Sequence, residues 1–253
     1  MFKVQFWKFI FPIHQYYFTY KEEKKSLWFA LFGVEEVIQS SEIIPKFYWT
    51  AYDTGITNLN DSMEDIFQTF SPTKRNEIKR AEKEWIKYEQ IVFSKTSLSV
   101  YVDFYNKFSK QKNLSWISLK FLLRFKWHLL ITRALYQDTT LVYHLFLVDW
   151  DYIRLFQSCS LFRDEDSLLP KNMISWANNG LHFFDLNLAK NLWYKTHDWW
   201  GIYNGLANTP DSIQKLNISQ FKLWFTPSLV THWNNIRYGY VLSLIINLWK
   251  RFF

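Results

Sequence analysis

The sequence predicts an α+β fold whose central sheet is mostly antiparallel and flanked by helices. Residues 127–136, 140–148 and 152–158 are rich in leucine, valine, isoleucine and aromatic side chains, and only short connections separate them. This is the pattern of an antiparallel meander. Helical patterns precede and follow the meander. Helices, a run of strands and then a further helix are typical of the α+β class.

The clearest helical pattern begins after Ser71, the expected N-cap, with Pro72 at the first helical position. Apolar residues at 78, 81, 85 and 88 follow at helical spacing. The other positions are strongly basic. We expect them to form a solvated face balanced by nearby glutamates, with contacts to phosphates as the alternative. The cations are Lys74, Arg75, Lys79, Arg80, Lys83 and Lys87.

Other elements are expected on either side of this helix. Aromatic-rich strands are expected at 15–20, 26–32, 47–52 and 89–93. Helices are expected at 98–109, 115–125 and 167–179. Asp53-Thr-Gly55 is expected to form a turn. Asn179 and Gly180 are expected to end the last of these helices, and a strand is expected at 181–186.

The composition favours a folded protein with anionic partners. The chain has 253 residues, of which 21% are aromatic, and it carries a formal net charge of +7 with a pI near 9.2. Such a charge favours phosphorylated substrates, nucleic acid or a lipid surface, and the alternative is a basic protein without a charged partner. Cys159 is the single cysteine, which excludes an internal disulfide and fits a reducing cytoplasm. We expect this thiol to be buried in a strand and inert.

Several motif-bearing enzyme classes are excluded. The sequence has no phosphate-binding glycine–lysine loop, no dinucleotide glycine fingerprint and no serine nucleophile elbow. Its six histidines lack the spacing of zinc ligands, so no metal site is expected. Kinase, dehydrogenase, serine hydrolase and metallohydrolase functions therefore have no support. No apolar run is long enough to cross a bilayer.

The chain is expected to have three parts. Residues 1–60 form a strand-rich segment that completes or extends the sheet, residues 61–230 form the core, and residues 231–253 form an amphipathic tail. Apolar residues recur at helical spacing in this tail, close to Lys250 and Arg251. The tail is expected to lie on a membrane surface, or to pack on the domain or on a partner helix.

Three motifs carry a resemblance to a known family. They are Phe70-Ser-Pro-Thr-Lys-Arg75-Asn-Glu-Ile78-Lys-Arg80-Ala81, Gly180-Leu-His-Phe-Phe184-Asp185-Leu, and Phe221-Lys222-x-x-Phe225. Their order and spacing resemble the GNAT-type acyltransferase fold, and within it the Fem-like branch, which includes peptidoglycan aminoacyl transferases. The resemblance covers about residues 59–227. It implies a GNAT-like sheet in residues 61–230.

The resemblance also implies catalytic roles for two residues. Lys222 would stabilise the negative charge that develops on the attacked carbonyl oxygen, because a fixed cation lowers the energy of that transition state. Asp185 would orient the acceptor amine or take its proton. The alternatives are a surface lysine beside buried aromatics and a carboxylate that caps a turn at a strand end.

Substrate contacts are expected from both motifs and from the basic helix. Phe184 and Phe221 would supply aromatic surroundings, and Arg75 and Arg80 would hold a phosphate of the acceptor. The expected acyl donor is acyl-CoA or aminoacyl-tRNA. Enzymes that use acyl-CoA place glycine-rich backbone where this chain has the acidic segment 162–167, which disfavours acetyl-CoA. Departures from the family pattern are Asn187-Leu188 in place of Gly-Gly, and Thr226 in place of glycine.

The expected function is transfer of an acyl or aminoacyl group onto an amine of a bacterial cell-surface glycan or peptidoglycan precursor. The acceptor would be a phosphorylated or nucleotide-linked sugar, and nucleic acid would be a partner only if tRNA is the donor. The expected location is cytoplasmic or peripheral at the inner membrane face. Two alternatives are a catalytically silent GNAT-like binding module and a nucleic-acid-binding protein that uses the helix after Ser71.

Overall fold

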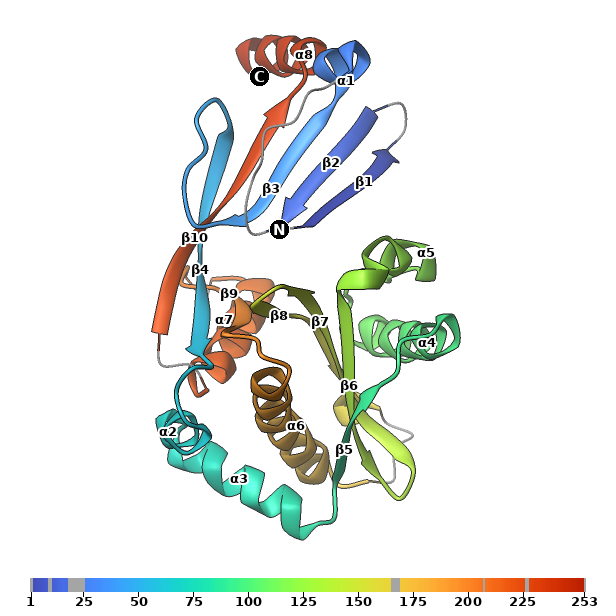
Figure 1. Ribbon diagram of the computed structural model, residues 1–253, viewed down its shortest axis with the longest axis vertical. Helices are drawn as coiled ribbons and strands as arrows, with labels where there is room; N and C mark the ends of the chain where they lie inside the picture. Colours follow the sequence, from blue (N-terminus) through green and yellow to red (C-terminus); the bar gives the residue numbers. More distant parts are fainter. Residues whose placement is uncertain are drawn as a thin grey trace. The chain divides into compact units, whose positions relative to one another are not determined.

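The computed structural model describes residues 2–8, 11–17, 26–164, 169–206, 208–225 and 228–252 (Figure 1). It has two compact units. We call Thr54–Leu229 the central unit, and Met1–Asp53 with Val230–Phe253 the terminal unit. Two strands, β4 (Tyr48–Asn58) and β10 (Ser228–Tyr238), have residues in both units. Each unit is described here by itself.

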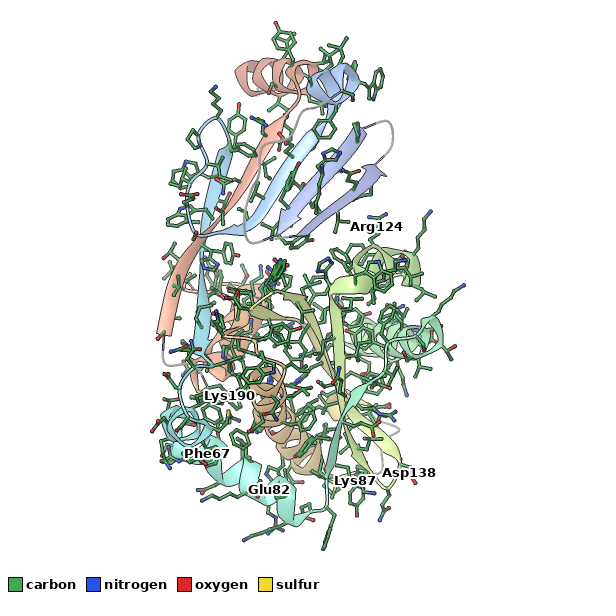
Figure 2. All side chains as sticks on the ribbon, in the orientation of Figure 1. Phe67, Glu82, Lys87, Arg124, Asp138 and Lys190 are labelled. Carbon is green, nitrogen blue, oxygen red and sulfur yellow. The ribbon has the colours of Figure 1, made fainter. Side chains whose placement is uncertain are left out.

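The central unit contains a mixed sheet in the order β4-β9-β8-β7-β6-β5. Pairing is antiparallel from β5 to β8 and parallel between β8 and β9. The expected meander and α+β class are therefore confirmed. Figure 2 shows Asp138 at the tip of the β6–β7 hairpin, where it has a left-handed φ of 64°. The strands are β5 (Lys87–Ile91), β6 (Leu129–Tyr136), β7 (Thr139–Asp149), β8 (Tyr152–Ser160) and β9 (Thr196–Ile202).

Helices cover both faces of this sheet. In Figure 1, α6 (Lys171–Asn191) and α4 (Lys95–Gln111) lie on opposite sides of β6 and β7. Two neighbouring residues of β7 contact helices on opposite faces of the sheet, because successive side chains in a strand point in opposite directions. Tyr143 packs against Tyr101 of α4, whereas His144 contacts α6. The remaining helices of this unit are α2 (Met63–Thr69), α3 (Pro72–Lys83), α5 (Leu119–Leu122) with a 3-10 turn (Leu123–His128), and α7 (Pro210–Leu223).

Helix α3 begins as the sequence predicts. The Ser71 hydroxyl accepts a hydrogen bond from the Lys74 backbone N–H, and Pro72 is at the first helical position. Ile78 and Ala81 are buried, in agreement with their helical spacing. The helix ends earlier than the apolar pattern suggests, because Trp85 has a left-handed φ of 58°. Tyr88 consequently belongs to strand β5.

The most important difference from the sequence-based expectation concerns α6. A helix ending at Gly180 and a strand at 181–186 were expected, but one helix runs from Lys171 to Asn191. A Cβ at Gly180 would overlap the Tyr88 side chain and touch Ala81. The glycine therefore allows close packing and does not end the helix. The expected helix start at 167, with Glu165 and Asp166, lies outside the described residues.

The expectations for two shorter segments were also wrong. Residues 26–32 do not form a strand, because α1 occupies Leu27–Phe32 and the Ser26 hydroxyl caps it by accepting a hydrogen bond from the Phe29 N–H. The expected turn at Asp53–Gly55 lies inside β4. The Thr54 hydroxyl donates there to Asp198, which ties β4 to β9. Cys159 is buried in β8 as expected, and burial raises the pKa of its thiol.

The terminal unit is a smaller sheet with two helices. Its strands are β1 (Phe2–Lys8), β2 (Phe11–Tyr17), β3 (Val34–Ser40) and β10, hydrogen-bonded in that order. The tail expected at 231–253 is a helix only in its second part, α8 (Tyr240–Phe252), because its first part belongs to β10; α8 packs beside α1. A partly buried ion pair links β3 and β10, with buried Glu35 accepting from Arg237 at 2.6 Å. Among the described residues, no helix is long and apolar enough to span a membrane.

Candidate functional site

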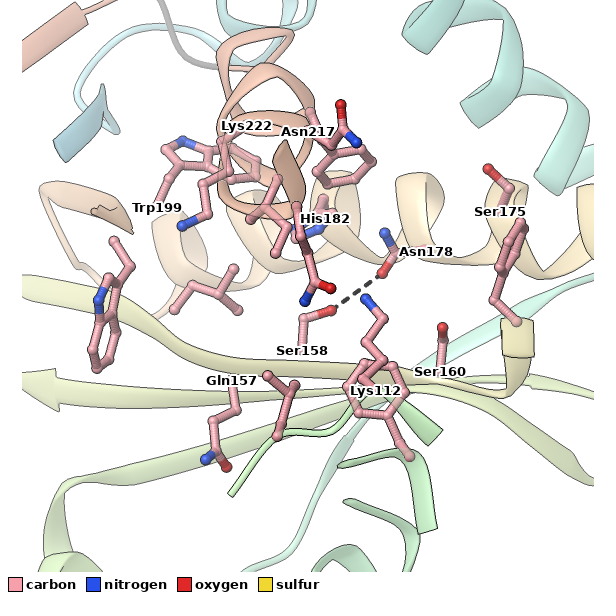
Figure 3. A pocket seen from close by; sticks show the side chains of 18 of the residues that line it. Lys112, Gln157, Ser158, Ser160, Ser175, Asn178, His182, Trp199, Asn217 and Lys222 are labelled. Atoms are coloured by element: carbon pink, nitrogen blue, oxygen red, sulfur yellow. Dashed lines mark hydrogen bonds between the residues drawn. The ribbon is translucent and has the colours of Figure 1, made fainter. Parts of the chain in front are cut away.

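A cavity of about 930 Å³ opens where β8 and β9 separate. The two strands pair only from Tyr152 to Arg154 on β8 and from Thr196 to Asp198 on β9. Beyond this point both strands continue without a pairing to each other, and their residues become walls of the cavity. Helices α4, α6 and α7 supply the other walls (Figure 3). The fold therefore provides a ligand-sized hollow without interrupting the rest of the sheet.

Asp198 fixes the strands at the point of separation. Its carboxylate accepts hydrogen bonds from the Tyr152 hydroxyl at 2.7 Å and from the Trp200 backbone N–H at 2.7 Å. Trp200 has a left-handed φ of 67°, a conformation that is uncommon for a large side chain. Its ring packs against the guanidinium of Arg154 at 4.1 Å. These contacts hold one wall of the cavity rigidly in place.

The cavity wall is positively charged. Lys112, which follows the last residue of α4, and Lys222 of α7 both line it, and none of the described lining residues is aspartate or glutamate. His182 of α6 is the titratable group between them in Figure 3. Apolar side chains from α4, α7 and β8 make up much of the remaining wall. Such a hollow favours a ligand that carries both an apolar part and negative charge.

Lys222 lies in the last turn of α7, with its ammonium directed into the hollow (Figure 3). The Nζ atom donates a hydrogen bond to the Gly201 carbonyl oxygen at 3.0 Å. Burial lowers the pKa of Lys222 to about 8, and the nearby Asp198 carboxylate opposes that shift. The side chain is thus a cation held in place at neutral pH, although it loses its proton more easily than an ordinary lysine.

His182 is fully buried beside Lys222. Its ring packs among aromatic side chains, with centroid distances of 5.0 Å to Trp199 and 5.5 Å to Phe221. Burial is the main cause that lowers the pKa of His182 well below its usual value, and neighbouring cationic groups add to the effect. The imidazole is therefore neutral at physiological pH. Its Nδ1 atom has no hydrogen-bond partner among the described residues.

A chain of polar contacts runs from the protein interior to the cavity wall. Asp185 Oδ2 lies 2.6 Å from His144 Nδ1, and His144 Nε2 lies 3.0 Å from the Asn178 side-chain oxygen. Asn178 lines the cavity and accepts a long hydrogen bond from Ser158, drawn as a dashed line in Figure 3. Burial raises the pKa of Asp185, and the adjacent His144 opposes the shift.

These groups include the one candidate metal-ligand set found among the described residues. His144, His182 and Asp185 offer ligand atoms within 4.8 Å of one another. The arrangement differs from a preformed metal site, because Nδ1 of His144 is hydrogen-bonded to the carboxylate and its ring stacks on His182 with centroids 4.1 Å apart. A cation would have to displace both contacts.

The structure brings only some of the sequence-predicted residues to the cavity. Lys222 and Phe221 line it, whereas Asp185 lies behind His144 and outside the lining. Phe184 packs on Tyr88 on the other side of α6. These placements follow from α6 being a helix, because Phe184 and Asp185 project in different directions from it.

The two arginines proposed to hold a phosphate are engaged elsewhere. Arg75 donates to the backbone carbonyls of Gln68 and Phe70, which closes the α2–α3 turn. Arg80 pairs with Glu84 on the surface of α3 and is not a lining residue.

Lys74 is the cation of α3 that reaches the Phe221 segment. Its side chain is buried and lies over the rings of Phe221 at 5.0 Å and Trp224 at 4.8 Å. Its ammonium donates to Glu77 at 2.6 Å, and Glu77 also accepts from Asn179. Lys74 therefore helps to fix the helix that carries Lys222.

The sequence contained a signal for two lining residues to which the three motifs gave no role, Asn178 and His182. Asn178, His182 and Asp185 are spaced by four and three positions, so they share one face once residues 171–191 are a helix. This shared face was not recognised because a strand was predicted at 181–186. His144 is separated from Asp185 by 41 positions, and no local pattern joins the two.

Comparison with solved structures shows which fold this is. A crystal structure of FemX superposes with a TM-score of 0.59 at 11% identity, over 81% of this chain and 64% of FemX. The C-terminal DUF2156 domain of a putative lysylphosphatidylglycerol synthetase from Agrobacterium fabrum gives 0.58 at 9% identity, over 96% and 83%. L-PGS from Bacillus licheniformis gives 0.54 at 14% identity, over 87% and 72%.

These similarities confirm the expected Fem-like GNAT fold. The identities are low, and this chain matches less than two thirds of FemX. The likeness therefore establishes the fold alone. No protein-family model matches the sequence. A search of curated proteins gives no significant match.

Proposed function

We propose that this protein is an acyltransferase that moves an aminoacyl group onto an amine of a bacterial cell-surface precursor. The observation that carries the proposal is Lys222, a cation with a pKa near 8 that faces a hollow without described carboxylates. Acyl transfer builds negative charge on the attacked carbonyl oxygen. A fixed ammonium in a partly desolvated hollow stabilises such charge more strongly than water does.

The proposed chemistry is direct attack. The acceptor amine adds to the carbonyl carbon of the donor ester, and Lys222 donates a hydrogen bond to the resulting oxyanion. The C–N bond forms, the ester C–O bond breaks, and the departing alkoxide oxygen of the donor becomes a hydroxyl by taking up the proton that the amine loses. The amine loses its proton to neutral His182, which lines the cavity beside Lys222. Asp185 and His144 would hold this wall from behind. No covalent enzyme intermediate is needed, since the single cysteine is buried.

Aminoacyl-tRNA is the favoured donor, with acyl-CoA as the alternative. The hollow combines cationic and apolar walls, which suits an acyl group joined to an anionic carrier. The net charge of +7 favours a polyanionic carrier further. The sequence of segment 162–167 has three carboxylates and no glycine, which disfavours binding of a pyrophosphate there.

The acceptor class is proposed from the resemblance and from the names of similar structures. The Fem-like branch implies aminoacyl transfer to peptidoglycan precursors, and lysylphosphatidylglycerol is a lipid that carries an amino acid. Both are cell-surface molecules. We therefore propose a precursor of a surface glycan or peptidoglycan, in the form of a phosphorylated or nucleotide-linked amino sugar or peptide.

A transfer assay tests the proposal. The purified protein is incubated with tRNA charged with radiolabelled amino acids, and with a nucleotide-linked peptidoglycan precursor as acceptor. We expect label to appear in the acceptor with the wild type and to disappear with Lys222→Ala. A parallel reaction with radiolabelled acyl-CoA distinguishes the donors. Absence of transfer from both donors to every amine offered contradicts the enzymatic proposal.

Binding measurements separate the two alternatives. Thermal shift with aminoacyl-tRNA, acyl-CoA and nucleotide-linked sugars identifies a bound ligand, because a ligand of the folded state raises the melting temperature. Ligand stabilisation without transfer supports a silent binding module. Salt-sensitive binding of uncharged RNA without sequence preference, combined with no transfer, supports a nucleic-acid-binding protein.

A further inference from the structure

Helices α1 and α8 of the terminal unit share an exposed apolar surface. The two helices lie side by side although more than 200 positions separate them in the sequence (Figure 1). Phe29 is the buried residue of α1, whereas Leu27 is 78% exposed. On α8, Tyr240 is 71% exposed and Leu244 is 51% exposed. The α1/α8 surface, as we define it, consists of Leu27, Trp28, Tyr240, Leu244 and Ile245.

The chemistry of this surface matches a bilayer interface. Trp28 and Tyr240 each have an apolar ring with a polar atom, the type of side chain that is enriched at the headgroup level. Leucine and isoleucine beside them are suited to the acyl boundary. The sequences of both helices lack acidic residues, and Lys250 and Arg251 belong to α8. A helix sequence that combines cations with apolar residues and has no acid complements anionic lipid headgroups.

We propose that the α1/α8 surface binds the interface of a bilayer containing anionic lipid. The sequence of α8 has two cations and no acid, which favours anionic lipid over a second copy of this like-charged helix. Membrane binding would concentrate the protein where precursors of cell-surface molecules are held. The proposal concerns the terminal unit and does not require the enzymatic activity, because binding is measured without substrate.

Vesicle sedimentation of the full chain tests this surface. The vesicles contain phosphatidylcholine alone, or phosphatidylcholine with about one third phosphatidylglycerol. We expect the wild type to sediment with the anionic vesicles. The variant Leu27→Glu/Leu244→Glu should bind at least about tenfold more weakly, because two carboxylates would enter the interface. Val92→Glu is the control, since Val92 is 85% exposed in the central unit and likewise changes from an apolar residue to glutamate.

A charge variant tests the electrostatic part separately. Lys250→Glu/Arg251→Glu should weaken binding to anionic vesicles by roughly fivefold or more for each cation. Circular dichroism melting checks that every variant is folded. The proposal is overturned if the wild type binds neither vesicle, or if Leu27→Glu/Leu244→Glu binds as the wild type does. It is also overturned if light scattering shows a dimer that this variant dissociates while vesicle binding is absent.

Discussion

Asp185 and His144 are hydrogen-bonded at 2.6 Å inside the central unit, although 41 positions separate them. Asp185 comes from α6 and His144 from β7, and both are fully buried. Through Asn178 this pair reaches the wall of the cavity that contains Lys222. A buried carboxylate that accepts from Nδ1 fixes the orientation and tautomer of an imidazole. In the proposed transfer reaction this pair would therefore position Asn178 and the cavity wall behind the reactive groups.

Replacing Asp185 by asparagine should disturb this positioning without emptying its volume. We expect Asp185→Asn to lower kcat by about 10- to 100-fold with a smaller change in KM, because the charge that orients His144 is lost. Nitrogen-15 NMR of labelled histidines should show a smaller Nδ1–H population for His144. Asp103→Asn on the exposed face of α4 is the control. An unchanged tautomer together with wild-type kcat would rule out the positioning role.

Lys222 should be indispensable for transfer. Removing one donor from an oxyanion site reduces kcat by about 10²- to 10³-fold, so Lys222→Ala should have at most this residual activity. Lys222→Arg keeps the cation but changes its shape, and should retain more activity than the alanine variant. Lys215→Ala on the same helix is the matched control, because Lys215 pairs with Asp211 at the surface. Wild-type rates for Lys222→Ala would show that the ammonium does not act in transfer.

The pKa of Lys222 predicts the alkaline limb of the pH profile. Its value near 8 means that the ammonium is present below pH 8 and is lost as the pH rises through this value. We expect kcat/KM to fall above about pH 8. The acceptor amine titrates as well, so the profile is compared with that of Lys222→Arg. A guanidinium stays protonated, and the fall should move above about pH 10. A limb that is unchanged in the arginine variant would assign it to another group.

The same burial predicts a stability effect. The pKa of Lys222 is lower in the folded than in the unfolded protein, so the unfolded state binds more protons between about pH 8 and 10.5. Wild-type stability should rise with pH across this window. Lys222→Met avoids burying the charge. It should raise the free energy of unfolding at pH 7 by roughly 1 kcal/mol, after allowance for the partial exposure of the side chain. This corresponds to a melting temperature higher by about 2–4 °C. This gain should shrink at pH 10. Equal melting temperatures at pH 7 would contradict the desolvation argument.

Local patterns in the sequence were sufficient for much of the fold. The meander was predictable because alternating apolar strands and short turns are encoded within a few residues, as at Asp138. The start of α3 was predictable because Ser71 and Pro72 act on their own backbone. The short helix α1 was missed, since six aromatic and aliphatic residues are compatible with either a strand or a helix.

The site was only partly predictable, because local sequence patterns identify a residue in a motif but not contacts between distant segments. Lys222 and Phe221 were found because a short linear motif carries them, and both line the cavity. His182 and His144 were missed because their arrangement depends on the packing of α6 against β7. The packing of the same helix against β5 and α3 depends on Gly180, which looks like a helix stop when only its neighbours in the sequence are considered.

Gly180 and Tyr88 provide a direct test of this packing. A Cβ at Gly180 would overlap the end of the Tyr88 ring, so Gly180→Ala should destabilise the protein by about 1–3 kcal/mol despite the higher helix propensity of alanine. Tyr88→Leu removes the overlapping atoms but loses the stacking on Phe184. In a double-mutant cycle measured by chemical denaturation, the combined variant should be more stable than additivity predicts, because the added methyl group then has space. The neighbouring exposed change Lys171→Ala on α6 should be additive with Tyr88→Leu. If Gly180→Ala is also additive with Tyr88→Leu, the close approach of α6 to β5 is not what requires glycine at this position.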